Sequence, residues 1–162
     1  MTASQPRDGA DPTRIVADAD VLAADLLVGG AARDALDAVR RHSWLTLVAS
    51  DHLLADAEAV IATLTEDALA DAWRVKVEEL CELVEHPEED HPALACAYRG
   101  GAGHLLSYDE QLAGVQAGAN LRQVMDTSVR EPRAFATVFD AAALYEAVED
   151  EPYPGPDRDP RA

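Results

Sequence analysis

Four aspartates stand at places where a buried strand would end or a helix would begin. They are Asp18 after Ile15-Val16-Ala17, Asp56 after Leu53-Leu54-Ala55, Asp90 before His91-Pro92, and Asp109 after Leu105-Leu106-Ser107-Tyr108. Carboxylate oxygens are the ligands that Mg²⁺ and Mn²⁺ prefer in proteins. If the fold gathers the four side chains, they make an all-oxygen metal site that could activate water against a phosphodiester. Phosphodiester hydrolysis is therefore the leading chemistry.

The chain is strongly acidic throughout. Asp and Glu supply 31 of its 162 residues against 13 Lys and Arg, and the net charge is -18. Many carboxylates must therefore be ordinary surface groups. Such a charge repels itself at low salt, whereas at about 1 M salt the Debye length falls to about 3 Å. We expect a protein from a halophile, whose nucleic-acid binding gains little from counterion release in concentrated salt.

Length and apolar content predict one globular domain. With 162 residues and 48% hydrophobic side chains, we expect a disordered lead-in over 1–12, a domain over 13–148 and a disordered acidic, proline-rich tail over 149–162. Cys81 and Cys96 fall in apolar helical patterns, which predicts reduced interior thiols. The sequence shows neither a signal peptide nor an apolar run of about 18 residues, so we expect a cytoplasmic protein without a membrane segment.

Apolar patterns alternate between strand-like and helix-like along the chain. Strands are expected over Arg14 to Asp18, Trp44 to Ala49, His104 to Ser107, and Leu121 to Met125 with Thr127 to Val129. Helices are expected over Asp20 to Val28, Ala31 to Arg41, a segment capped by Ser50 and running to Leu64, Thr65 to Val84, Pro92 to Arg99, Asp109 to Ala117, and Pro132 to Val148.

This alternation predicts an α/β fold, a three-layer α/β/α sandwich with a mostly parallel central sheet. Ligands of open parallel sheets bind at the carboxyl ends of the strands. Asp18 and Asp109 follow two strands and should share that edge. Asp90 precedes a helix that would face the same edge, and Asp56 lies one turn into the helix after the second strand.

These motifs resemble those of PIN-domain ribonucleases between about Arg14 and Asp140. The strongest stretches are Asp90-His91-Pro92-Ala93-Leu94-Ala95-Cys96-Ala97 and Ala102-Gly103-His104-Leu105-Leu106-Ser107-Tyr108-Asp109. They are similar to the family's acidic residue before an alanine-rich helix and to its Thr-Gly-Asp after the next strand. Val16-Ala17-Asp18-Ala19-Asp20-Val21-Leu22 and Ser50-Asp51-His52-Leu53-Leu54-Ala55-Asp56 resemble its first two motifs, although glutamate is usual at the position of Asp56, and Ser107 and Tyr108 replace threonine and glycine.

The resemblance implies a PIN-like fold and an endoribonuclease that depends on Mg²⁺ or Mn²⁺. Asp18, Asp56, Asp90 and Asp109 would hold the metal, which would activate the attacking water and stabilise the leaving 3′ oxygen. Ser107 would orient a carboxylate or the water, and Asp20 would support or join the ligands. RNA is the expected substrate. The enzyme could be the toxin of a toxin–antitoxin pair, with an antitoxin protein as partner, or an RNA-processing nuclease. It could also form a homodimer.

Other interpretations stay open at this level. Each aspartate could simply cap a helix, and Asp56 lies among other acids on a face that solvent could cover. A catalytically inactive PIN-like module that binds RNA or a protein is the main alternative. Asp18-Ala19-Asp20 also resembles the first motif of haloacid-dehalogenase phosphatases, but Leu22 stands where that family needs Thr or Val, and Lys76 falls inside a helix.

Overall fold

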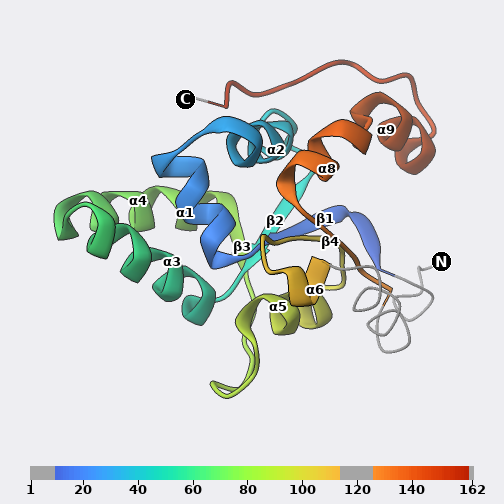
Figure 1. The fold of residues 1–162 in the computed structure, drawn as a ribbon. Helices are drawn as coiled ribbons and strands as arrows, with labels where there is room; N and C mark the ends of the chain where they lie inside the picture. The colour runs from blue at the N-terminus through green and yellow to red at the C-terminus, as the bar shows by residue number, and fades with distance from the viewer. Residues whose placement is uncertain (1–9, 114–125, 161–162) are drawn as a thin grey trace.

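Five parallel strands form the central sheet of the computed structural model, which describes residues 10–113 and 126–160 (Figure 1). The order across the sheet is β3-β2-β1-β4-β5, so the first strand of the chain lies at the centre. The strands are β1 (Asp11–Ala17), β2 (Thr46–Ala49), β3 (Cys81–Leu83), β4 (Ala102–Leu106) and β5 (Ser128–Arg130).

Helices connect the strands and cover both faces of the sheet. They are α1 (Ala19–Leu27), α2 (Gly30–Arg40), α3 (Asp51–Leu64), α4 (Asp67–Leu80), α5 (Pro92–Gly100), α6 (Glu110–Ala113), α8 (Pro132–Val138) and α9 (Ala141–Glu149). Helix α5 packs on β1, β2 and β4, while α1 contacts α2 and α3, and α2 contacts α8. Figure 1 shows α5 and α6 below the sheet and α1, α2 and α8 above it. The predicted three-layer α/β architecture is therefore confirmed, with a wholly parallel sheet among the described strands.

The sheet is the centre of the hydrophobic core. Buried side chains of β1, β2 and β4 meet Phe135 from α8 and the small residues of α5. Because a sheet covered on both faces buries both sets of alternating side chains, its strands become continuous apolar runs. Ile15-Val16-Ala17 and Leu47-Val48-Ala49 have this character. Among the described residues, no helix combines the length and apolar character needed to cross a membrane.

Two helical boundaries differ from the sequence expectation. The segment Thr65 to Val84 was predicted as one helix. The helix ends at Leu80, and Cys81 to Leu83 form a strand that pairs with β2. Cys81 is therefore a strand residue, although both cysteines are free thiols as expected. The predicted helix from Pro132 to Val148 is two helices, because Asp140 accepts a hydrogen bond from the backbone N–H of Ala143 and starts α9 anew.

Two further expectations concern the C-terminal half of the domain. The described part of the predicted helix Asp109 to Ala117 is α6, which covers Glu110–Ala113. The strand predicted over Leu121 to Met125 lies outside the described residues. Pairing of β5 with β4 begins instead at Ser128, opposite His104.

The segment after α9 runs back along the end of α2, whereas its composition predicts a disordered tail. Backbone N–H groups of Asp157 and Arg158 donate to the carbonyl of Arg41 at 2.9 and 3.1 Å. The Tyr153 hydroxyl lies 2.6 Å from Nε2 of His42, whose Nδ1 donates to the Ala38 carbonyl. Polar and aromatic contacts thus hold a segment that buries little apolar surface, a possibility that composition does not reveal.

Candidate functional site

The candidate site lies at the centre of the sheet, between the strands that the chain adds on one side (β2, β3) and those that it adds on the other (β4, β5). Strand β1 pairs with β2 on one side and with β4 on the other, so the carboxyl ends of β1 and β4 form the topological switch point at which α/β sheets bind ligands. Ala17 pairs with Leu106. The next residues, Asp18 and Ser107, therefore stand side by side at this edge.

Ser107 joins the two strand ends and is fully buried. Its hydroxyl donates to Oδ2 of Asp18 at 2.9 Å, and its oxygen accepts from the backbone N–H of Asp109 at 3.0 Å. Its own N–H donates to the carbonyl of Arg130 at 3.0 Å. One side chain thus fixes the carboxylate that follows β1 and the backbone of the acidic residue that follows β4.

Asp18 and Asp109 each combine a local structural role with a free ligating capacity. Oδ1 of Asp18 accepts from the N–H of Ala19 at 2.8 Å, so Asp18 is the N-cap of α1. Oδ1 of Asp109 accepts from the N–H of Gln111 at 2.9 Å. A carboxylate has about four lone-pair positions, so neither contact occupies either group fully. Capping and metal binding are compatible here.

Asp20 lies within electrostatic reach of both carboxylates. The partial burial of its carboxyl group raises its pKa, and the charges of Asp18 and Asp109 raise the pKa further, although much of the side chain is exposed. Each of these effects disfavours the ionised form. The two neighbouring carboxylates thus disfavour the charged form of Asp20, and a bound cation would relieve this effect.

Glu131 is a fourth acid at this edge that the sequence reading did not single out. It follows β5 directly and occupies the N-cap position of α8, but its side chain makes no capping hydrogen bond. Burial raises the pKa of Tyr108, and the charges of Asp20 and Glu131 add to that increase, which places all three within one electrostatic neighbourhood. In the sequence, an acidic residue that follows a short strand and precedes a proline, as in Glu131-Pro132, indicates the start of a helix and could have identified this position.

Asp56 and Asp90 are exposed, and their carboxylates have no hydrogen bond or ion pair among the described residues. Asp56 lies in the second turn of α3. Asp90 lies in the turn before α5, whose capping residue is His91. Within residues 10–113 and 126–160, no group of three or more His, Cys, Asp or Glu side chains is arranged to hold a metal ion. The contacts thus join Asp18, Ser107 and Asp109, and they do not extend to Asp56 or Asp90.

A second polar cluster stands at the ends of β2 and β3. Ser50 caps α3 as expected by accepting from the N–H of Leu53, and its hydroxyl lies 2.8 Å from Nε2 of His86. Nδ1 of His86 donates to the Pro87 carbonyl at 2.8 Å, so Nε2 is the acceptor for the serine hydroxyl. Ser50 is only 1% exposed. This pair therefore anchors the loop after β3 and does not present a nucleophile to solvent.

Comparison with known families identifies the chain's relatives. A family model described as "Family of unknown function (DUF7384)" matches residues 9–161, and the chain belongs to that family. The match corrects the PIN-domain resemblance, because no PIN-domain family is detected. Short acidic motifs arise readily in a chain with 31 acidic residues, which explains the misleading likeness. Comparison with curated proteins and with solved structures finds no match.

Proposed function

We propose that this member of the family is a hydrolase that depends on Mg²⁺ or Mn²⁺ and cleaves phosphodiester bonds within RNA. One observation carries the proposal: Ser107 links the carboxylate of Asp18 to the backbone of Asp109 at the switch point of the sheet. Ligand sites of parallel α/β sheets occur at this position. The oxygen-only character of the neighbouring side chains favours a hard divalent cation.

The residues present fit such a cation in their chemistry. Asp18 and Asp109 would hold the cation, and Asp20 is close enough for both of their charges to raise its pKa. A bound divalent ion would supply a water activated at neutral pH and would stabilise the charge that develops on the leaving oxygen. Both effects suit hydrolysis of a phosphodiester, whose attacking and leaving groups are oxygens.

The chain's own residues would position the reacting groups. Ser107 is fully buried and bonded on three sides, so it holds the Asp18 carboxylate in one orientation. Asp18 is held further by the start of α1. Fixed carboxylates need little rearrangement when a substrate arrives, and this preorganisation lowers the barrier to reaction.

A module that binds RNA without cleaving it is the second candidate. It is favoured by the absence, among the described residues, of three ligating side chains already arranged around one point. The two candidates differ in a single property, which is turnover. If the protein cleaves RNA, it could act as a toxin with an antitoxin partner or as an RNA-processing nuclease. A small antitoxin-like reading frame immediately upstream of this gene would favour the toxin.

The test is cleavage of single-stranded RNA in molar KCl with Mn²⁺ or with EDTA. We expect internal cleavage with Mn²⁺ and none with EDTA, and we expect Asp18→Asn and Asp109→Asn to lower the rate roughly a hundredfold or more, because several kcal/mol of charge stabilisation depend on the ion. RNA binding with no cleavage under any divalent metal would favour the binding module instead.

A further inference from the structure

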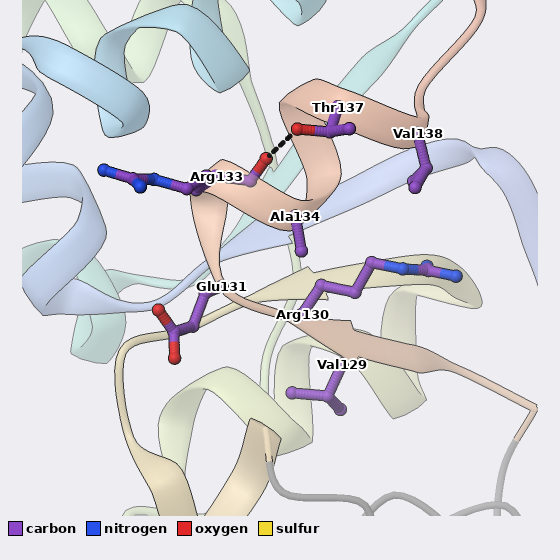
Figure 2. A pocket seen from close by; sticks show the side chains of 7 residues that line it. All are labelled: Val129, Arg130, Glu131, Arg133, Ala134, Thr137 and Val138. Carbon is purple, nitrogen blue, oxygen red and sulfur yellow. Dashed lines mark hydrogen bonds between the residues drawn. The ribbon is translucent and has the colours of Figure 1, made fainter.

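A groove of about 560 Å³ lies between β5 and α8, beside the acidic edge (Figure 2). Arg130, Glu131, Arg133 and Thr137 supply its polar lining, and Val129 and Val138 are among its apolar residues. Figure 2 shows the Arg133 and Glu131 side chains extending to one side of α8 and Arg130 extending to the other, toward Val138. The groove therefore has an arginine on each side, with Ala134 between them and the Glu131 carboxylate on the side of Arg133.

Among the described residues, the two arginine side chains make no internal polar contacts, in contrast to several other arginines of the chain. Ion pairs occupy Arg14, Arg40 and Arg74. Within the part of the chain that the structure describes, neither Arg130 nor Arg133 has a side-chain hydrogen bond or an ion pair. With only 13 basic residues against 31 acidic ones, two free guanidinium groups on one groove are available for an anionic ligand.

The groove adjoins the strand ends at which the proposed metal site lies. Glu131 lines the groove and also lies near Tyr108, the residue between Ser107 and Asp109. The carbonyl of Arg130 accepts the hydrogen bond from the N–H of Ser107. A chain molecule bound at the acidic edge could therefore pass directly into the groove.

We propose that this groove binds the phosphate backbone of the single-stranded RNA on one side of the bond that is cleaved. The inference rests on the proposed function, because it assigns the substrate's path from that site. Guanidinium groups bind phosphate oxygens in a bidentate manner, and one such contact on each side would hold successive phosphates. Ala134 and Val138 would lie against the less polar faces of ribose or base. The excess of acidic over basic residues disfavours phosphate binding elsewhere on the chain at low salt, whereas the two arginines favour it at this groove.

The experiment measures binding of a fluorescent single-stranded RNA by anisotropy, in EDTA, over a series of KCl concentrations in which the fold is intact by circular dichroism. Each phosphate contact on a single strand contributes about 0.7 to the slope of log affinity against log salt. The double variant Arg130→Gln/Arg133→Gln should therefore lose about 1.4 from that slope and bind roughly tenfold more weakly or worse. Arg130→Lys/Arg133→Lys keeps both charges and should keep most of the slope.

Arg99→Gln is the matched control. Arg99 is exposed in the last turn of α5, has no ion pair among the described residues and loses one positive charge, as each of the two groove arginines does. We expect its affinity and salt slope to equal those of the wild type. Equal values for the double variant and the wild type, or an equal loss in Arg99→Gln, would overturn the groove as the site.

The outcomes separate this inference from the proposed function. Cleavage by the wild type with an unchanged KM in the double arginine variant refutes the groove and leaves the nuclease intact. Binding that requires both arginines, without cleavage by any metal-loaded sample, supports the groove and refutes the nuclease. A wild-type protein that neither binds nor cleaves RNA overturns both.

Discussion

The Ser107 hydroxyl donates a 2.9 Å hydrogen bond to Oδ2 of Asp18, across 89 positions of sequence. Both residues follow central strands, and the serine oxygen also receives the N–H of Asp109. A fully buried hydroxyl that connects two strand ends stabilises the fold and also fixes the carboxylate that it contacts. These two roles can be separated by substitution.

Ser107→Ala should lower the rate of metal-dependent RNA cleavage by roughly ten- to a hundredfold, the range found when groups that orient a metal ligand are removed. The free energy of unfolding should fall by about 1 to 3 kcal/mol, because the N–H of Asp109 and the carboxylate of Asp18 each lose a partner. Ser107→Thr keeps the hydroxyl and should keep most of the activity. Single-turnover kinetics and urea unfolding measure the two effects; full activity in Ser107→Ala would show that the orientation of Asp18 is unimportant.

Asp20 provides a test of charge repulsion at the same edge. Its pKa is raised by burial and by Asp18 and Asp109, so ionisation near neutral pH costs the folded state free energy. A raised carboxyl pKa weakens the fold as pH rises above the unfolded value of about 3.9. Asp20→Asn should therefore raise metal-free stability at pH 7, by less than about 1 kcal/mol because solvent screens the exposed part of the side chain.

The same substitution should lose this advantage at pH values below the unfolded pKa of Asp20, where the wild-type side chain is neutral as well. Thermal unfolding in EDTA and molar KCl at both pH values measures the difference. Asp67→Asn, in the first turn of α4 and away from the sheet edge, is the matched control. A stability gain in Asp67→Asn equal to that in Asp20→Asn would mean that general surface charge, and not this site, is responsible.

The C-terminal segment should detach at low pH. Hydrogen bonds from the Ser43 hydroxyl and N–H lower the pKa of Asp157. A lowered carboxyl pKa stabilises the fold above the unfolded pKa, and this contribution is lost as pH falls through the folded pKa. Hydrogen exchange of the Asp157 and Arg158 amides, which donate to the Arg41 carbonyl, should therefore accelerate in acid.

Tyr153→Phe tests the same attachment from its other contact. It leaves Nε2 of the buried His42 without its partner and should destabilise the protein by about 1 kcal/mol. Urea unfolding measures the change, with Tyr98→Phe on the exposed side of α5 as the control. If neither exchange nor stability changes in these experiments, the segment contributes nothing to the fold.

Salt dependence follows from the net charge of -18. Repulsion among carboxylates destabilises the compact state at low ionic strength and is screened in concentrated salt. The midpoint of thermal unfolding should rise substantially between low and molar KCl. An unchanged midpoint would refute the expectation of a halophilic protein.

The strands and most helices were predictable because their apolar patterns are local. Ile15-Val16-Ala17 indicates a buried strand, Ser50 is a capping residue, and Gly29 and Gly30 both have positive φ where α1 gives way to α2. Cys81 to Leu83 was missed because a three-residue strand that directly follows a helix carries no period of its own. Only its pairing with β2 makes it a strand.

The candidate site was predictable in part. Asp18 and Asp109 follow predicted strands of a parallel sheet, so topology alone places them at one edge. The resemblance led us to expect that Ser107 orients a carboxylate or the water. That its hydroxyl bonds Asp18 needed coordinates, because the hydroxyl could have served the local helix instead. For Asp56 and Asp90, the order of elements permits an approach to that edge, but the orientation of exposed helix and turn residues is set by packing. Family membership could not be inferred from four aspartates in so acidic a chain.

The central claim is a divalent cation bound at the ends of β1 and β4. Its most direct measurement is a titration with Mn²⁺ followed by electron paramagnetic resonance, in molar KCl so that weak surface binding is screened. We predict saturable binding to the wild type that is lost in Asp18→Asn and Asp109→Asn and retained in Asp56→Asn and Asp90→Asn, each of which removes one exposed charge from the same acidic chain. Equal binding by all four variants and the wild type would contradict the claim.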